Sequence, residues 1–193
     1  MTYLLPGNER TTLSKDDLIC KSAQEQGNQT NGYPALKASP GEVIALRYRE
    51  NGHITKTTAD KMTFGAVSVY GTVNSKPADQ LSEIHHIWNA NNTGGDQRGR
   101  LLVRQSFDDG ACYELNDSAL SMARAATGQP PHDALDGTGL ACKVEFTLPI
   151  DVGKGGLYTV YWVWDWPSNG ESTVAPGVTK EQYYTSCLDI QIV

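Results

Sequence analysis

Short apolar stretches with the period of β-strands recur along this chain, and little in it favours helices. The C-terminal stretch shows the pattern clearly, because Leu188, Ile190 and Ile192 alternate with the polar Asp189 and Gln191. This alternation is expected of a strand with one buried face. Pro-Gly, Asn-Gly and Gly-Gly pairs, which favour turns, lie between such stretches. The strands predicted in this way are 42–48, 65–71, 100–104, 143–148, 157–164 and the C-terminal stretch.

Helical signal is limited to two brief segments, 118–126 and 78–84. Short strands joined by turn residues and long loops are typical of an antiparallel sandwich. The chain has 193 residues, of which 39% are hydrophobic, enough for one core. We therefore expect one all-β domain over residues 1–193, an immunoglobulin- or fibronectin-III-like antiparallel β-sandwich with long loops and one or two short helices.

The charge of the chain excludes two classes of partner. Its formal net charge is -6 and its sequence pI is about 5.1, whereas nucleic acids and anionic membrane surfaces recruit basic patches. No apolar run approaches the roughly 18 to 20 residues of a membrane span. The opening MTYLLPGNER has neither the charged nor the apolar region of a signal peptide. We expect a soluble protein that binds neither nucleic acid nor membrane.

Cysteine usage indicates an oxidising compartment. The four cysteines lack the Cys-x-x-Cys spacing of zinc and redox motifs. N-glycosylation sequons fall in stretches rich in Gly, Asn and Asp. These features favour a secreted, extracellular glycoprotein with two disulfides, and the alternative is a cytosolic protein with reduced cysteines and chance sequons. The cysteines are Cys20, Cys112, Cys142 and Cys187, and the sequons begin at Asn28, Asn91 and Asn116.

Histidines supply candidate ligands in two places. The Asn51-Gly52 pair predicts a tight turn that leaves His53 at the rim of the sheet. A rim histidine is by default only solvated, but it is also a common metal ligand. The adjacent pair 85–86, His-His, could serve instead, and His132 is expected to be an ordinary loop residue.

Three segments, in order, resemble landmarks of the fungal lytic polysaccharide monooxygenases that act on cellulose. They are Asp17-Leu18-Ile19-Cys20, the strand ending at His53, and Gln182-Tyr183-Tyr184-Thr185-Ser186-Cys187. The resemblance implies that His53 is a copper ligand, that Tyr184 is the axial group and that Gln182 lies beside it. It also implies a disulfide between Cys20 and Cys187. The second expected disulfide joins Cys112 to Cys142 across a loop of about 30 residues.

The chain is also similar to a group of secreted fungal relatives of these enzymes. Segments 45–53, 106–110 and 161–167 carry this likeness, which by itself does not settle a function. Two features depart from the cellulose-active enzymes. Their copper is also held by an N-terminal histidine, whereas this chain begins with Met1, so we expect that an N-terminal segment is missing. They also place a histidine near the end of the strand that here carries Trp164, Trp166 and Ser168.

The resemblance therefore implies a copper protein that acts on or binds polysaccharide. One histidine and a phenol cannot hold copper tightly, so the chain as it stands is expected to be inactive. The alternative is a non-catalytic relative that handles copper or binds carbohydrate or a cell surface. The residue after the signal cleavage site of the precursor separates these functions, since a histidine there favours the copper classes.

Several aromatic and acidic residues are interpreted as structural rather than as binding or catalytic residues. Trp162 and Trp164 are expected in the core, because aromatic area commonly fills a sandwich, while Trp166 before a proline is expected to be more exposed. Four aspartates could be imagined as glycosidase carboxylates. They are interpreted instead as turn residues: Asp96, Asp108, Asp109 and Asp165.

Overall fold

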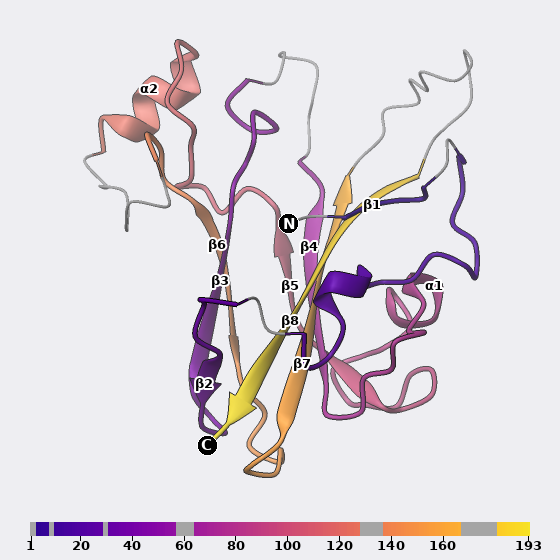
Figure 1. Ribbon diagram of the computed structural model, residues 1–193. Helices are drawn as coiled ribbons and strands as arrows, with labels where there is room; N and C mark the ends of the chain where they lie inside the picture. The colour runs from indigo at the N-terminus through magenta and orange to yellow at the C-terminus, as the bar shows by residue number, and fades with distance from the viewer. Residues whose placement is uncertain (1–2, 8–9, 29–30, 57–63, 128–136, 167–180) are drawn as a thin grey trace.

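Two β-sheets packed face to face make up most of the described chain (Figure 1). The computed structural model describes residues 3–7, 10–28, 31–56, 64–127, 137–166 and 181–193. In these residues the strands are β1 (Tyr3–Leu5), β2 (Leu36–Ala38), β3 (Val43–Tyr48), β4 (Ala66–Thr72), β5 (Gly99–Ser106), β6 (Cys142–Thr147), β7 (Leu157–Trp166) and β8 (Gln182–Ile192). The helices are the 3-10 turn η1 (Ser22–Gln24), α1 (Leu81–Ile84) and α2 (Ala119–Ala125).

The larger sheet has the strand order β1-β8-β7-β4-β5, and β2 also pairs with β8. β1 pairs antiparallel with the beginning of β8, around Tyr184, and β2 pairs parallel with its end, around Gln191. The smaller sheet is the antiparallel pair β3-β6. It covers one face of the larger sheet, and α1 lies on the other side (Figure 1).

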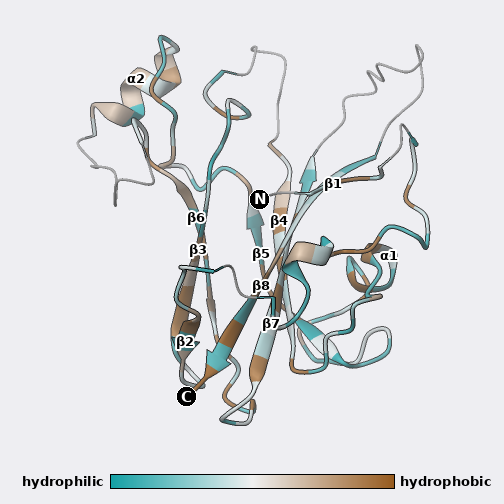
Figure 2. Cartoon of the chain, in the orientation of Figure 1, coloured by the Kyte–Doolittle hydropathy of each residue, from teal (hydrophilic) through white to brown (hydrophobic). Residues whose placement is uncertain are grey.

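β7 explains how one sheet supports two cores. Its residues 158–164 are all buried, so the strand is covered on both faces, and apart from Thr159 these residues are hydrophobic. Trp162 and Trp164 belong to the core between the sheets, whereas Tyr161 and Val163 belong to the core under α1. Bands of hydrophobic residues lie along β3, β7 and β8 in Figure 2.

Two disulfides fasten loop segments to strands of the two sheets. Cys20 is bonded to Cys187 of β8, and Cys112 is bonded to Cys142 at the start of β6. Both pairings were predicted and are confirmed. Among the described residues, no helix has the length and apolar character needed to cross a membrane.

The expected fold class is confirmed, with long loops and two short helices in the described chain. All six predicted strands and both helices are present, and α2 begins where the Ser118 side chain accepts a hydrogen bond from the Ser121 N–H. The three-residue strands β1 and β2 were missed. The sandwich is also not wholly antiparallel, because β2 runs parallel to β8.

The predicted burial of the tryptophans is confirmed, since Trp162 and Trp164 are buried and Trp166 is half-buried. The interpretation of Asp165 as a turn residue is wrong. This aspartate lies within β7, paired with Ala66 and Tyr183 on the neighbouring strands. The other three aspartates lie outside helices and strands, as expected of turn residues.

Candidate functional site

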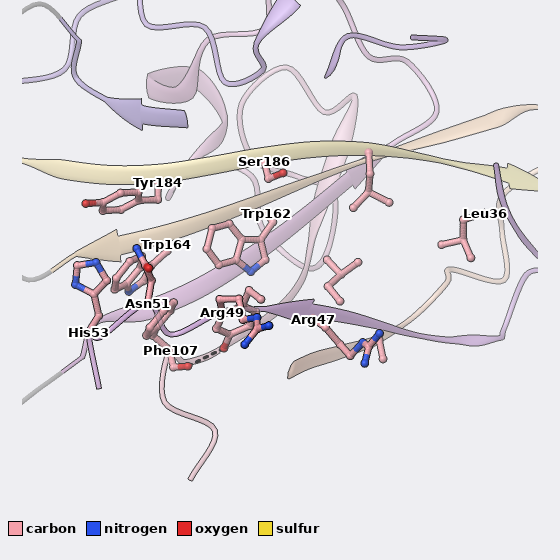
Figure 3. A pocket seen from close by; sticks show the side chains of 14 residues that line it. Leu36, Arg47, Arg49, Asn51, His53, Phe107, Trp162, Trp164, Tyr184 and Ser186 are labelled. Atoms are coloured by element: carbon pink, nitrogen blue, oxygen red, sulfur yellow. Dashed lines mark hydrogen bonds between the residues drawn. The ribbon is translucent and has the colours of Figure 1, made fainter. Parts of the chain in front are cut away.

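A cavity of about 570 Å³ lies between β3 and the face of the larger sheet formed by β7 and β8 (Figure 3). We call it the β3 pocket. Its walls combine aromatic rings with a few polar groups, the usual composition of a small-molecule site. The lining residues are Leu36, Ala45, Leu46, Arg47, Tyr48, Arg49, Asn51, His53, Phe107, Trp162, Trp164, Tyr184, Ser186 and Leu188.

Stacked aromatic rings make up one wall of the β3 pocket. The ring of Trp164 stacks on Phe107, with centroids 3.7 Å apart, and on Tyr184, with centroids 4.9 Å apart. Its indole N–H donates to the carbonyl oxygen of Phe64 at 2.9 Å. Trp164 is therefore held firmly as part of the core.

Trp162 differs from Trp164 in the state of its polar atom. Its ring lies 5.2 Å from that of Tyr48, whose hydroxyl donates to the Phe107 carbonyl oxygen at 2.7 Å (Figure 3). The Trp162 Nε1 is buried and has no hydrogen-bond partner among the described residues. A buried donor without a partner is unfavourable. The atom is covered in this structure, so an acceptor in the pocket reaches it only after a small shift of the ring or its neighbours.

The turn after β3 positions His53. Asn51 and Gly52 both have positive φ, at 47° and 75°, which confirms the predicted Asn-Gly turn. The carboxylate of Glu50, only 1% exposed, accepts the N–H groups of Ile54 at 2.6 Å and Thr55 at 3.1 Å. A buried side chain thus fixes the loop from which His53 reaches the pocket.

Of the predicted copper-site residues, the structure brings His53 and Tyr184 together. Their ring centroids are 6.2 Å apart, and both lie at one end of the β3 pocket (Figure 3). His53 also packs edge-on against Trp166 at 4.6 Å and Trp164 at 5.1 Å. Gln182 lies two residues before Tyr184, on the same face of β8 and opposite Trp166. It is not among the residues that line the pocket.

The fit of this group to copper is incomplete. Among the described residues that line the pocket, His53 provides the one imidazole. Burial raises the pKa of Tyr184 above its ordinary value, so at neutral pH its phenol is protonated and a weak ligand. Copper favours several nitrogen ligands in a fixed arrangement. His53 and Tyr184 could supply two positions, but they do not form a complete site.

The remaining candidates lie apart from the β3 pocket. His85 and His86 follow α1 on the other face of the larger sheet, and His132 lies outside the described residues. Asn28 and Asn91 are exposed, as N-glycosylation requires, although the sequon of Asn28 continues outside the described residues. The Asn116 amide nitrogen donates to Thr55 Oγ1 at 2.8 Å and to a carbonyl oxygen at 2.7 Å, so a glycan there would disturb these bonds.

Three features that shape the pocket are only weakly indicated by the sequence. Glu50 follows an arginine in a turn, a context typical of solvent-exposed residues, and gives no signal of burial. Phe107 was noticed only within a similar segment, although an aromatic residue directly after a strand could have indicated a wall. Trp162 was correctly placed in the core, but its unpartnered N–H depends on neighbours that only the fold defines.

Comparisons with known proteins assign the chain to a family. No curated protein matches the chain. Among solved structures it is similar to CvAA9A, an AA9 lytic polysaccharide monooxygenase, with 14% identity and a TM-score of 0.47, over 99% of this chain and 70% of that one. So distant a likeness leaves the function to be argued from this chain's own residues. The family model described as a domain of unknown function, DUF7492, matches residues 1–193, and the chain belongs to that family.

Proposed function

We propose that this protein is an extracellular polysaccharide-binding protein related to the lytic polysaccharide monooxygenases, and that the β3 pocket receives sugar units of the chain. The observation that carries the proposal is the unpartnered Trp162 indole N–H in an aromatic-walled cavity. Sugars match these two features, because their C–H faces pack on aromatic rings and their hydroxyl oxygens accept hydrogen bonds.

Polar groups around the pocket favour a hydroxyl-rich ligand over a purely apolar one. Arg47, Arg49 and Asn51 line it from β3 and the following turn, and Ser186 lines it from β8. Pockets of this kind use a few placed polar groups to orient a ligand that packs on apolar walls. A cavity of about 570 Å³ has room for a few sugar units rather than for a long chain.

Secretion is part of the same proposal. Both disulfides join segments that the fold already places side by side, and such bonds persist in oxidising compartments. Polysaccharides of cell walls are encountered outside the cell, which agrees with this location.

Binding measurements on one matched pair of variants test the sugar proposal. Trp162→Phe keeps an aromatic ring in the pocket but removes the N–H, while Trp88→Phe makes the same change in the core under α1. We expect Trp162→Phe to weaken binding of cellulose, chitin or xylan oligosaccharides by roughly 2- to 10-fold, the value of one hydrogen bond. Trp88→Phe should leave binding unchanged. No binding to any of the three, or equal binding by wild type and Trp162→Phe, would contradict the proposal.

Copper binding at His53 and Tyr184 is the second candidate function, favoured by the 6.2 Å approach of their rings. Bound copper would supply redox chemistry next to the sugar. With one imidazole and a protonated phenol we expect a weak copper(II) site in the pocket, and His53→Ala should remove that site. Titration of both proteins with copper(II), followed by electron paramagnetic resonance, checks this. Unchanged spectra and affinity in His53→Ala would remove the pocket as a copper site.

A further inference from the structure

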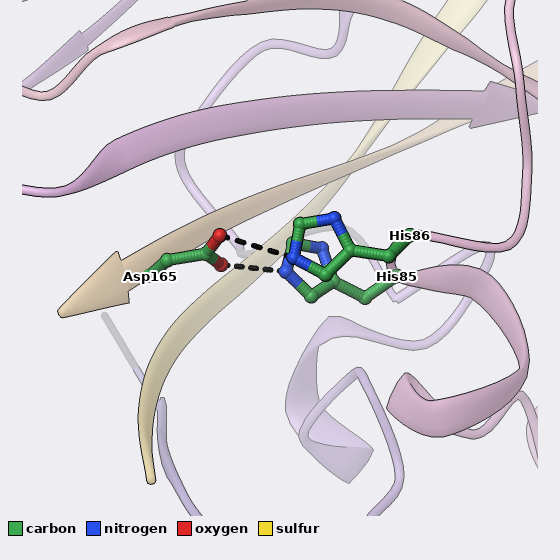
Figure 4. Close-up of side chains that lie close together, drawn as sticks. All are labelled: His85, His86 and Asp165. Atoms are coloured by element: carbon green, nitrogen blue, oxygen red, sulfur yellow. Dashed lines mark ion pairs between the residues drawn. The ribbon is translucent and has the colours of Figure 1, made fainter. Parts of the chain in front are cut away.

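A second group of ligand side chains lies on the face of the larger sheet opposite the β3 pocket. His85 and His86 follow α1, and Asp165 reaches them from β7 (Figure 4). One ligand atom from each residue lies within 4.8 Å of the other two. The His85 Nε2 is 2.5 Å from Asp165 Oδ1, and the His86 Nε2 is 3.3 Å from Asp165 Oδ2.

The backbone at this point is shaped to bring both imidazoles to one side. Consecutive residues normally diverge, but His86 has φ of 61°, in the left-handed region that only a few non-glycine residues adopt. Its ring centroid lies 3.8 Å from that of His85. Strained backbone of this kind persists where surrounding contacts hold it, often at functional sites.

Tyr70 provides those contacts. Its buried hydroxyl accepts the backbone N–H of His86 at 3.0 Å and lies 3.0 Å from the Nδ1 of His85. Metal-bound histidines commonly have their second ring nitrogen fixed by a hydrogen bond. Tyr70 thus holds one imidazole by its ring and the other by its backbone, and leaves both Nε2 atoms toward Asp165 (Figure 4).

The two closest atoms of the cluster, His85 Nε2 and Asp165 Oδ1, do not form a hydrogen bond with each other. His85 Nε2 and Asp165 Oδ1 are in contact, but they are not aligned for a hydrogen bond, and both are buried without a hydrogen-bond partner. Buried polar atoms that lack a hydrogen bond are costly, even where they lie in an ion pair. A cation bound by both lone pairs would satisfy both atoms at once.

We propose that His85, His86 and Asp165 bind a divalent first-row transition metal ion such as Zn²⁺ or Cu²⁺. Two imidazoles and a carboxylate are ligands that these ions accept, and three protein ligands leave a position open. The side chain of His85 is only 3% exposed, whereas that of His86 is 53% exposed, so an ion would enter on the His86 side. The site goes beyond the proposed sugar binding and shares no residue with the β3 pocket.

One neighbouring charge opposes the ion. The guanidinium of Arg104 lies 3.9 Å from Asp165 Oδ2 on a side chain that is 53% exposed. Without the ion it partly balances the carboxylate, and with the ion it would be repelled toward solvent. Removal of this cation should therefore strengthen metal binding.

Calorimetric titration of the full chain with Zn²⁺, and separately with Cu²⁺, tests the site. We expect one Zn²⁺ per chain, one Cu²⁺ per chain that binds more tightly than any copper at His53, and at least about 10-fold weaker binding of either ion at this site in His86→Ala. His86 is the exposed member, so its removal should leave folding intact, which thermal unfolding verifies. His53→Ala, an equal change in the β3 pocket, should bind Zn²⁺ as the wild type does. Arg104→Gln should bind it more tightly, by a few-fold.

Three outcomes overturn the proposal, and none depends on sugar binding. The wild type could bind neither ion at about 0.1 mM, which would leave the cluster as an ion pair with a stacked histidine. His86→Ala could bind as tightly as the wild type. Loss of binding in His53→Ala alone would place the ion in the pocket instead. Substitution with Co²⁺, whose visible absorption changes when histidine nitrogens coordinate it, gives a readout that is independent of affinity.

Discussion

Glu50 shows how one buried carboxylate shapes the rim of the β3 pocket. It is 1% exposed and accepts hydrogen bonds from Ile54, from both the N–H and the hydroxyl of Thr55, and from the N–H of Glu114. The donors come from two loops. The carboxylate therefore joins the turn that carries His53 to the segment after the Cys112 disulfide.

We expect Glu50→Gln to lower the free energy of unfolding by about 2 to 3 kcal/mol, because hydrogen bonds to a charged acceptor are lost and an amide N–H₂ faces N–H donors. Glu145→Gln is the matched control, since Glu145 is half-exposed in an ion pair with Lys143 and should change stability by less than about 0.5 kcal/mol. Urea unfolding of the three proteins measures the difference. Equal stability of the two variants would show that the buried bonds of Glu50 contribute little.

The adjacent tyrosines of β8 illustrate what single residues reveal before the fold is known. Alternation along a strand predicts that Tyr183 and Tyr184 point to opposite faces, and they do: Tyr184 stacks on Trp164, whereas Tyr183 packs edge-on against His85. The sequence could not predict which side chains each tyrosine contacts on its face of the sheet. That depends on His53 and His85, which are distant in sequence from β8.

The N-terminal segment is fastened to the larger sheet by several independent contacts. β1 pairs with β8, Cys20 is bonded to Cys187, and the backbones of Ile19 and Asp79 are joined by a hydrogen bond of 2.9 Å. This segment and α1 together close the second core.

The two disulfides should differ in their contributions to stability. Cys20 and Cys187 are separated by 167 residues in sequence, and Cys112 and Cys142 by 30. Since a longer closed loop restricts the unfolded chain more, we expect Cys20→Ala with Cys187→Ala to cost about 1.5 kcal/mol more than Cys112→Ala with Cys142→Ala. Urea unfolding without reductant measures both costs. A larger cost for the shorter loop would mean that native packing, rather than loop entropy, dominates.

Asp17 makes the anchoring of this segment sensitive to acid. Burial by itself would raise the pKa of Asp17, but hydrogen bonds from the Arg10 side chain and the Ser14 N–H outweigh it, and the pKa lies below the ordinary 3.8. A lowered pKa stabilises the fold above the unfolded value, and this stabilisation is lost as the pH falls through the folded value. The stability difference between wild type and Asp17→Asn should therefore be larger at about pH 6 than at about pH 3. A constant or growing difference in urea unfolding would refute the assignment.

β7 shows what a sequence pattern can and cannot predict about a whole strand. Its apolar run predicted a strand with Trp162 and Trp164 in the core, whereas the burial of its second face was seen only in the structure. Asp165 was misassigned because Asp-Trp-Pro is also typical of a chain leaving a strand. The residue stays in β7, where its carboxylate meets His85 and His86 from the loop after α1. No local pattern connects positions 80 residues apart, so this cluster could not be predicted.

Across the molecule, one sheet separates two candidate sites. Trp164 faces the β3 pocket, and the next residue, Asp165, faces the histidine pair. The fold class and most strands followed from short-range periodicity, while the parallel pairing of β2 with β8 and the opposed sites depend on long-range packing. Because the sites lie back to back, variants of one serve as controls for the other.

The net charge of the whole chain leads to a final prediction about the proposed sugar ligand. The formal charge is -6, which disfavours polyanions, yet Arg47 and Arg49 line the β3 pocket. If a neutral polysaccharide binds by aromatic packing and uncharged hydrogen bonds, its affinity should change by less than about twofold between roughly 0.1 M and 1 M NaCl, since salt screens only charges. Calorimetry with neutral oligosaccharides and with an anionic oligogalacturonate, each at both salt concentrations, shows whether the preferred ligand is neutral or acidic. Tight binding of the anionic sugar that collapses at high salt, and is lost in Arg49→Gln, would show that the arginines outweigh the net charge and that the natural ligand is acidic.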